Sequence, residues 1–292
     1  MHFKYLFLAP YLLSLSACMT ATIDESSVFT PTKYTFDPDR KGMAIDKENI
    51  LSGKGVGLSH FKIVSDIGPI AMTLATRPAY AGRPLILTCM GNASDRRKSG
   101  ASYIDSSIDF GDVLIFDYPG YNDSAGEASE KDFNAAVKAI ITHVENEKSK
   151  TGRPIVAWGQ SLGGFICSEM VKRSDAFDGN IIETSAQNAK QVAKTWVPAI
   201  AKPFVDVDIK ESLLAYDSAN AMKEFKGPIL VLGAGKDKVL EVELSRKLSA
   251  SLAAQGNDIE YVEFSLAGHN NLRSAKGFEN TAKKFFAKFR SF

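Results

Sequence analysis

Short apolar runs alternate with longer amphipathic stretches along most of the chain. Residues 57–64 (GLSHFKIV) and 69–76 (PIAMTLAT) alternate partly between apolar and polar positions, which predicts an opening pair of strands. Residues 83–89 (RPLILTC) and 112–118 (DVLIFDY) are continuous apolar runs, as expected for strands covered on both faces. The pattern therefore predicts a sheet that starts with an antiparallel pair and continues with buried strands.

Helical spacing marks the stretches between these runs. In residues 129–150 the apolar positions recur every three or four residues, and Ser129 stands in front as a candidate N-cap. Further helices are expected over 95–109, 161–173, 242–255 and the C-terminal segment, and further strands over 153–159, 179–185, 227–235 and 258–265. Strands that alternate with helices predict an α/β fold, with a mostly parallel central sheet and helices on both faces. In such sheets ligands bind beyond the carboxyl ends of the strands.

The N-terminus has a different pattern. Lys4 precedes an apolar stretch over residues 5–17, which is too short to span a bilayer and suits the h-region of a signal peptide. The letters LSAC at 15–18 resemble a bacterial lipobox, so we expect residues 1–17 to be removed and Cys18 to carry the lipid. Plain secretion or a coincidental apolar start is the alternative. The residue after Cys18 is Met19, not the aspartate that is associated with retention in the inner membrane of enteric bacteria. We therefore expect the lipid anchor to lie in the outer membrane, with the protein facing the periplasm.

The chain after the signal peptide is expected to form a tether followed by one globular domain. Residues 18–50 are polar and predict a tether and irregular lead-in, and residues 51–292 predict a single domain, with 186–226 as a possible small cap. Candidate cap residues are Trp196, Val197, Pro198, Phe204 and Val205. The alternative is that 186–226 holds an ordinary helix and connection whose apolar residues face the core.

Charge and cysteine content narrow the function further. Lys and Arg number 35 against 34 Asp and Glu, and no basic run stands out, so we expect no nucleic-acid partner. With Cys18 lipidated, Cys89 and Cys167 are left. In an oxidising envelope such a pair could form a disulfide. Cys89 ends a buried run and Cys167 falls in a helix, so we expect two buried free thiols and no disulfide.

The sequence Gly159-Gln-Ser161-Leu-Gly163 lies between a predicted strand and a predicted helix. This is the context of a nucleophile elbow, where a sharp turn exposes the serine hydroxyl and side chains at the two glycines would collide with neighbouring backbone. Helix onset at the serine also directs backbone N–H groups toward a developing anion. A plain Gly-rich turn is the alternative, so the rest of the chain must supply a base and an acid.

Elimination leaves one histidine in the right place. Of the 4 histidines, His2 lies in the predicted signal peptide, His60 falls in the first strand and His143 lies mid-helix. His269 follows the last predicted strand. Asp237 directly follows a buried strand, one helix and one strand earlier. Asp237 could instead be a turn or cap residue, and His269 an ordinary surface residue. The order Ser161, Asp237, His269 matches that of a serine hydrolase triad on a parallel sheet.

Asp206, Asp208 and Asp217 are weaker candidates for the acid, because no strand end delivers them to the sheet edge. An oxyanion hole needs two N–H donors. The amide of Leu162 follows the nucleophile, and the loop after the third strand offers the amide of Asn92, where Gly91 permits close approach. A plain strand-to-helix turn would also suit Gly91-Asn92.

Taken together, these segments resemble the α/β-hydrolase fold superfamily, especially abhydrolase-domain serine hydrolases related to acyl-protein thioesterases and serine aminopeptidases. The matching segments are LILTCMGNAS, IFDYPGYNDSAGEASE, WGQSLGG, VLGAGKD and AGHNNL, in family order from about residue 60 to the C-terminus. The resemblance implies Ser161, Asp237 and His269 as the triad and Asn92 and Leu162 as oxyanion donors. Met90-Gly91 stands where the family usually has His-Gly.

The expected function is a membrane-anchored serine hydrolase that cleaves an ester, thioester or amide of an acyl substrate through an acyl-enzyme. No cofactor or metal is expected. Two alternatives stay open: a non-catalytic envelope lipoprotein with the hydrolase shape, and a peptidase on the same fold. A fluorophosphonate probe would separate the first alternative from an active hydrolase, and a comparison of aminoacyl amides with acyl esters would separate the second.

Overall fold

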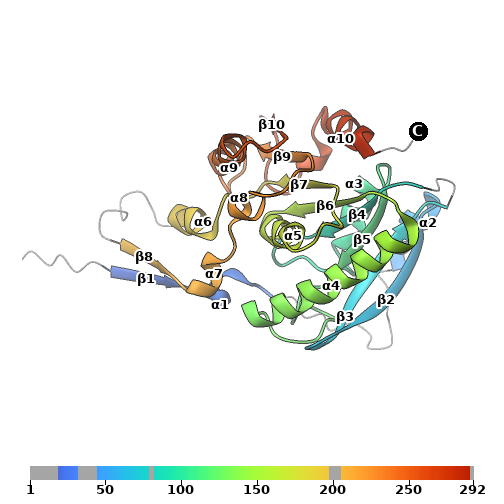
Figure 1. Ribbon diagram of the computed structural model, residues 1–292, viewed down its shortest axis with the longest axis horizontal. Helices are drawn as coiled ribbons and strands as arrows, with labels where there is room; N and C mark the ends of the chain where they lie inside the picture. Colours follow the sequence, from blue (N-terminus) through green and yellow to red (C-terminus); the bar gives the residue numbers. More distant parts are fainter. Residues whose placement is uncertain (1–18, 32–44, 79–81, 197–204, 290–292) are drawn as a thin grey trace, which may run out of the picture.

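The computed structural model describes residues 19–31, 45–78, 82–196 and 205–289, so the predicted signal peptide and Cys18 lie outside the described residues. Its main body is an eight-stranded sheet with helices on both faces (Figure 1). The strand order is β10-β9-β7-β6-β4-β5-β3-β2. The strands are β2 (Gly57–Ser65), β3 (Gly68–Thr76), β4 (Leu85–Cys89), β5 (Asp112–Phe116), β6 (Ile155–Gln160), β7 (Gly179–Glu183), β9 (Ile229–Ala234) and β10 (Ile259–Phe264).

The sheet follows the predicted topology. β2 and β3 form the antiparallel opening pair, β3 is also antiparallel to β5, and the pairs from β5 through β10 are parallel. Every residue of β4, β6, β7 and β9 is buried, because helices cover these central strands from both sides. The carboxyl ends of the parallel strands therefore meet at one edge of the sheet.

Two helical layers enclose this sheet (Figure 1). One face packs against α4, α5 and α9, and the other packs against α2, α3 and α10. Their bounds are α2 (Ile45–Gly53), α3 (Gly100–Ser107), α4 (Glu130–Thr151), α5 (Leu162–Lys172), α9 (Val242–Ala254), α10 (Phe278–Phe286), and the short 3-10 helices η1 (Leu272–Ser274) and η2 (Ala287–Phe289). In the described ranges, no helix is long and apolar enough to cross a membrane.

Helix α4 illustrates how local sequence sets an element's ends. The Ser129 side chain accepts a hydrogen bond from the Asp132 amide, as the N-cap prediction required. Gly152 ends the helix with φ 65°, a conformation that glycine adopts without steric penalty. The apolar positions at helical spacing are buried against the sheet and α5: Phe133, Val137, Ile140, Ile141 and Val144.

A second, two-stranded sheet lies beside the main body (Figure 1). Its strands β1 (Met19–Ile23) and β8 (Val205–Ile209) run parallel. The helices in this region are α1 (Glu25–Val28), α6 (Ala189–Trp196), α7 (Glu211–Leu214) and α8 (Ser218–Ala221). The described residues of 186–226, which are 186–196 and 205–226, contain three short helices and a strand, more structure than one helix and a connection.

The lead-in differs from the sequence expectation of an irregular tether. Residues 19–31 form β1 and α1 and pack on the body, because β8 supplies β1 with a hydrogen-bonding partner far along the chain. Of the candidate cap residues, Trp196 ends α6 and Val205 begins β8. The candidates Val197, Pro198 and Phe204 lie outside the described residues.

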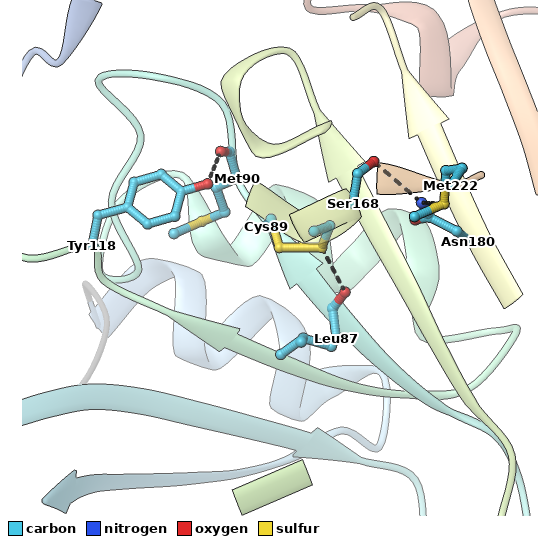
Figure 2. The surroundings of a disulfide bond; sticks show 8 residues. Leu87, Cys89, Met90, Tyr118, Ser168, Asn180 and Met222 are labelled. Carbon is cyan, nitrogen blue, oxygen red and sulfur yellow. Dashed lines mark hydrogen bonds between the residues drawn. A yellow bond between two sulfur atoms is a disulfide. The ribbon is translucent and has the colours of Figure 1, made fainter. Parts of the chain in front are cut away.

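The prediction of two free thiols is wrong, because Cys89 and Cys167 form a disulfide with Cα atoms 5.8 Å apart (Figure 2). Cys89 is the last residue of β4, and Cys167 lies in α5, which packs directly over that strand. The bond joins residues 78 positions apart in the chain. Burial of each cysteine was predicted correctly, but only the packing of α5 on β4 brings the two sulfurs together.

Candidate active site

Ser161 lies in the turn between β6 and α5, at the carboxyl edge of the sheet. Its backbone has φ 54° and ψ −119°, a region that non-glycine residues rarely adopt. Such strain persists only where the surrounding structure enforces it, and it is concentrated at functional sites. The conformation matches the sharp strand-to-helix turn of a nucleophile elbow.

Close backbone packing enforces this turn. A Cβ at Gly159 would lie 2.1 Å from the Gly163 carbonyl oxygen, and one at Gly163 would lie 1.9 Å from the Cys89 carbonyl oxygen. Neither position therefore admits a side chain. The Ser161 amide donates to the Glu183 carbonyl at 2.9 Å, which further fixes the elbow against β7.

Asp237 and His269 are in direct contact. Nδ1 of His269 lies 2.7 Å from Oδ2 of Asp237, whose side chain is 1% exposed. The other carboxylate oxygen accepts from the amides of Val239 and Leu240, at 2.8 Å each. These amides fix the carboxylate so that it orients the imidazole and favours the tautomer with its proton on Nδ1.

The loops that carry Asp237 and His269 are joined to each other and to the elbow. The Lys236 amide donates to the Ala267 carbonyl at 2.7 Å. Nε2 of Gln160, the residue before Ser161, donates to the His269 carbonyl at 3.0 Å. No hydrogen bond joins the Ser161 hydroxyl to the His269 ring, although both residues are described. In free enzymes such contacts are often long and shorten when substrate binds.

The two candidate oxyanion donors flank the elbow. Leu162 is the first residue of α5, where the backbone N–H has no partner within the helix. Asn92 follows β4 in a loop that two tyrosines shape. The hydroxyl of Tyr118 donates to the Met90 carbonyl, as Figure 2 shows, and that of Tyr103 accepts from the Gly91 amide at 3.0 Å. Within the described ranges, neither the Leu162 nor the Asn92 amide donates a hydrogen bond, so both are available.

The weaker candidates have other contacts. His60 in β2 bonds to the Thr73 hydroxyl at 2.8 Å, and His143 in α4 lies against the Phe61 ring. Asp217 caps α8 by accepting from the Asn220 amide at 2.8 Å. Asp206 and Asp208 are exposed on β8. None of these five residues contacts Ser161 or His269.

Sequence reasoning missed a buried polar network beneath the site. Oε2 of Glu183 accepts from Trp158 at 2.8 Å and from Arg273 at 2.9 Å. The Arg273 guanidinium also lies over the rings of Trp158 and Tyr103, 4.3 and 4.9 Å from their centres. The Tyr103 hydroxyl donates to Gln160, which links this network to the elbow. The only sequence signal was the position of Gln160 within the Gly-x-Ser-x-Gly motif.

The DYPGYNDSAG segment, residues 117–126, has a structural role behind the loop that follows β4 and carries Asn92, here called the oxyanion loop. Asp117 accepts from the Arg96 backbone at 2.7 Å and from its guanidinium at 3.3 Å. Burial raises the pKa of Asp117 to about 6, although the charge of Arg96 lowers it in part. Asp123 from the same segment pairs with Arg96 and Arg97, at 2.8 and 2.6 Å. These ion pairs attach the segment to the chain that follows the oxyanion loop.

An apolar cavity of about 160 Å³ opens beside Ser161. Its walls come from the N-terminal segment, from α5, from the 186–226 region and from the loop after Asp237. The lining side chains include Val28, Phe29, Phe165, Val192, Leu213 and Leu240. A second cavity of about 730 Å³ has polar walls that include Tyr103, Gln160 and Arg273, and Asn92 borders both cavities. The site therefore has an apolar side and a polar side.

No group of three or more His, Cys, Asp or Glu side chains suited to a metal ion occurs among the residues that the structure describes.

The sheet order, the elbow and the positions of Ser161, Asp237 and His269 define the class: the chain has the α/β-hydrolase fold. Solved structures agree. The esterase Pf2001 of Pyrococcus furiosus superposes with a TM-score of 0.64 over 90% of this chain and 100% of its own, at 13% sequence identity. The acylaminoacyl peptidase of Pyrococcus horikoshii has a TM-score of 0.61 and 16% identity over 82% of this chain and 43% of its own.

Sequence comparisons find a family model that matches part of this chain and a curated relative. The family model described as Chlamydia CHLPS protein (DUF818) matches residues 89–224. Lysophosphatidylserine lipase ABHD12 of Danio rerio is 27% identical over 206 residues, which cover 63% of this chain and 52% of that protein. The chain thus spans about half the length of this curated relative.

Proposed function

We propose that this protein is a lipid-anchored serine hydrolase that cleaves an acyl substrate through an acyl-enzyme, with Ser161 as nucleophile, His269 as base and Asp237 as its partner. The observation that carries the proposal is the strained backbone of Ser161 at the end of a buried strand. An ordinary Gly-rich turn has no need of a non-glycine residue at φ 54°, whereas a nucleophile elbow does.

In the first step, Nε2 of His269 accepts the hydroxyl proton of Ser161 while Oγ forms a bond to the substrate carbonyl carbon. The carbonyl oxygen becomes an oxyanion and accepts hydrogen bonds from the amides of Leu162 and Asn92. The Asp237 carboxylate stabilises the imidazolium by its contact with Nδ1. The carbon then expels its leaving group, which takes the proton from His269, and the acyl-enzyme is left.

In the second step, a water molecule gives a proton to His269 and attacks the acyl carbon. The second oxyanion uses the same two amides. Its collapse breaks the bond to Oγ, which regains the proton from His269, and the carboxylic acid leaves. Each oxyanion donor of this kind contributes roughly 3–4 kcal/mol to the transition state.

Among the possible substrates, we favour a carboxylic ester with an apolar acyl chain. The cavity beside Ser161 is lined almost throughout by apolar side chains, which suits an acyl group, and the polar cavity beyond Asn92 suits a polar leaving group. The zebrafish relative, whose name describes a lipase, also supports an ester substrate. Thioesters, amides and peptide substrates are tested beside esters.

We propose further that Cys18 carries the lipid and anchors the chain in the bacterial envelope, on the periplasmic side of the outer membrane. The apolar stretch before Cys18 and the LSAC letters support this. Two or three acyl chains, at about 0.8 kcal/mol per buried CH₂, are enough for stable anchoring. Expression with a labelled fatty acid tests the proposal: the wild-type chain should incorporate label and the Cys18→Ser chain should not.

The catalytic proposal is tested with Ser161→Ala on p-nitrophenyl esters, using the Cys18→Ser background to avoid detergent. We expect ester hydrolysis to fall to the uncatalysed rate with no loss of folded structure by circular dichroism. Ser52→Ala, at an exposed serine of α2, is the matched control and should hydrolyse esters as the parent does. Undiminished hydrolysis by Ser161→Ala would contradict the proposal. Faster cleavage of aminoacyl amides than of esters would favour a peptidase.

A further inference from the structure

The chain that directly follows Cys18 lies at the active site. β1 pairs with β8 along its whole length, so that Met19 lies opposite Val205 and Ile23 lies opposite Ile209. The Lys210 amide continues this pairing by donating to the Ile23 carbonyl at 3.0 Å. The first described residues are thus joined to β8, in the region between β7 and β9 (Figure 1). Residues of this region line the cavity beside Ser161. The segment Met19–Thr30 is therefore attached to the region that surrounds the candidate active site.

Phe29 fixes this segment by burial. Its side chain is 3% exposed and stacks on the Phe133 ring, with centres 4.4 Å apart. It also meets the Tyr216 ring edge-on at 6.5 Å. Phe133 belongs to α4 and Tyr216 follows α7, so one aromatic side chain joins the main body to the 186–226 region. Aromatic pairs of this kind stabilise by about 0.5–1.5 kcal/mol beyond their buried area.

Hydrogen bonds join the same segment to the oxyanion loop. The Asn92 side-chain amide donates to the Val28 carbonyl at 2.5 Å, and its oxygen accepts from the Thr30 amide at 3.0 Å. Tyr121 donates to the same oxygen at 2.8 Å. The Asn92 side chain is therefore occupied by the N-terminal segment, while its backbone amide is left for the oxyanion.

Three side chains of the segment line the apolar cavity: Ile23, Val28 and Phe29. They face Val192 and Leu213 from the 186–226 region, and Ser161 opens into the same space. Ser161 lines this apolar cavity and does not line the polar cavity beside Asn92, so the apolar cavity suits an acyl chain attached to Ser161. Ile23, Val28 and Phe29 would therefore contact the acyl chain of a substrate bound in this cavity.

We propose that Ile23, Val28 and Phe29 form the acyl-specificity wall of the enzyme, with Val28 and Ile23 limiting the length of acyl chain that the pocket accepts. The inference rests on the proposed hydrolase function. It adds that acyl-chain length determines which substrates are accepted, and that these N-terminal side chains set the limit. Each methylene lost from or added to such a pocket changes specificity about 10- to 200-fold, so single substitutions are informative.

The test uses p-nitrophenyl esters from acetate to dodecanoate with four forms of the full mature chain: wild type, Val28→Phe, Ile23→Ala and Ser26→Phe. Val28→Phe fills the cavity and should lower kcat/KM for the longest esters by about tenfold or more relative to acetate. Ile23→Ala enlarges it and should shift the optimum to longer chains. Ser26→Phe adds the same ring at an exposed position of α1 and should keep the wild-type profile.

Binding of decanoate to the Ser161→Ala chain, measured by calorimetry, separates the wall from the chemistry. The wall predicts binding that Val28→Phe removes and Ser26→Phe keeps. One outcome is that no ester is hydrolysed, while decanoate binds and Val28→Phe abolishes this binding. The hydrolase proposal then fails, and the proposal that these side chains contact an acyl chain is supported. If esters are hydrolysed while the chain-length profile and decanoate binding are the same in Val28→Phe, Ile23→Ala and wild type, the wall is overturned. Ile23→Ala keeps the test decisive should Val28→Phe fail to fold.

Discussion

Ser161 adopts a backbone conformation with φ 54° that an L-residue holds at a cost of about 1–3 kcal/mol. The surrounding glycines make this turn possible, but they do not remove the strain at the serine itself. Alanine at the same position would keep the strain, whereas glycine would relieve it. The site thus trades stability of the fold for exposure of a hydroxyl group.

We therefore predict that Ser161→Gly is more stable than Ser161→Ala, by about 1 kcal/mol, although both are inactive. Urea unfolding of the two variants measures the difference in free energy of unfolding. Equal or lower stability of the glycine variant would mean that the turn is not strained at this residue.

We propose that Gln160 positions His269, because its side-chain amide donates to the His269 carbonyl. Its side chain accepts from the Tyr103 hydroxyl and donates to the His269 carbonyl. Because the Tyr103 hydroxyl also accepts from the Gly91 amide, Gln160 connects the oxyanion loop with the loop that carries His269. We predict that Gln160→Met lowers kcat roughly 10- to 100-fold with little change in KM, because a small displacement of the base costs rate rather than binding. Steady-state kinetics on a short ester provide the measurement, with Gln255→Met at an exposed position after α9 as control. A raised KM with unchanged kcat would assign Gln160 to substrate binding instead.

His60 gives the fold a pH dependence. Burial lowers its pKa below the usual 6.5, the charge of Arg96 lowers it further, and Glu48 and its hydrogen bond oppose this only in part. The folded state therefore binds the proton less tightly than the unfolded state. The resulting stabilisation is full above pH 6.5 and is lost as the pH falls below it.

The measurement compares wild type with His60→Gln by urea unfolding at pH 7.5 and pH 5. The stability advantage of the wild type over the glutamine variant should shrink on acidification. A constant or growing difference would show that His60 does not titrate as a buried neutral group.

The catalytic candidates were predictable residue by residue, because Ser161, Asp237 and His269 each follow a strand that its apolar run reveals. Gln160, Tyr103 and Arg273 were not, since their roles depend on side chains that meet only after β6, α3 and η1 pack together. Local pattern identifies where a strand ends. It carries no information on which distant polar group will lie beneath that end.

At the scale of elements, the disulfide joins β4, which leads into the oxyanion loop, to α5, which begins at the nucleophile. The helix packs so closely that its Gly163 faces the Cys89 carbonyl. A covalent bond at this point holds together the two elements that supply the Leu162 and Asn92 amides. It also suits the oxidising compartment that the proposed export implies.

Closing a loop of this size stabilises a fold by about 4 kcal/mol through the unfolded state. We predict that reduction of the Cys18→Ser chain, or the further change Cys89→Ser, lowers the free energy of unfolding by about this amount in urea. Thiol titration of the denatured, unreduced Cys18→Ser chain should find no free thiol. Two free thiols and identical unfolding curves with and without reductant would contradict the bond.

Elements with local signals were predicted well and long-range pairings were not. In the main sheet, β2 and β3 follow from partial apolar and polar alternation and the central strands from apolar runs, and α4 follows from its spacing and its Ser129 cap. β1 was missed because a five-residue strand in a polar lead-in is stable only when β8 pairs with it, and β8 lies far along the chain. The disulfide was missed for the same reason.

At the scale of the molecule, the predicted anchor and the acyl pocket are close along the chain. Ile23, which lines the pocket, lies only a few residues after Cys18, and extended chain covers at most about 3.6 Å per residue. A lipid on Cys18 would therefore hold the apolar side of the active site within about 20 Å of the membrane. This geometry suits a substrate whose acyl chain comes from a lipid.

The account as a whole depends on Ser161 being the nucleophile of a working hydrolase. The most direct measurement is to label the protein with a fluorophosphonate probe and to locate the adduct by tandem mass spectrometry. We predict a single adduct on the Ser161 hydroxyl that disappears in His269→Ala, in a protein whose ester hydrolysis stops in step with labelling. An adduct on a different serine, or continued ester hydrolysis by the fully labelled protein, would contradict the account.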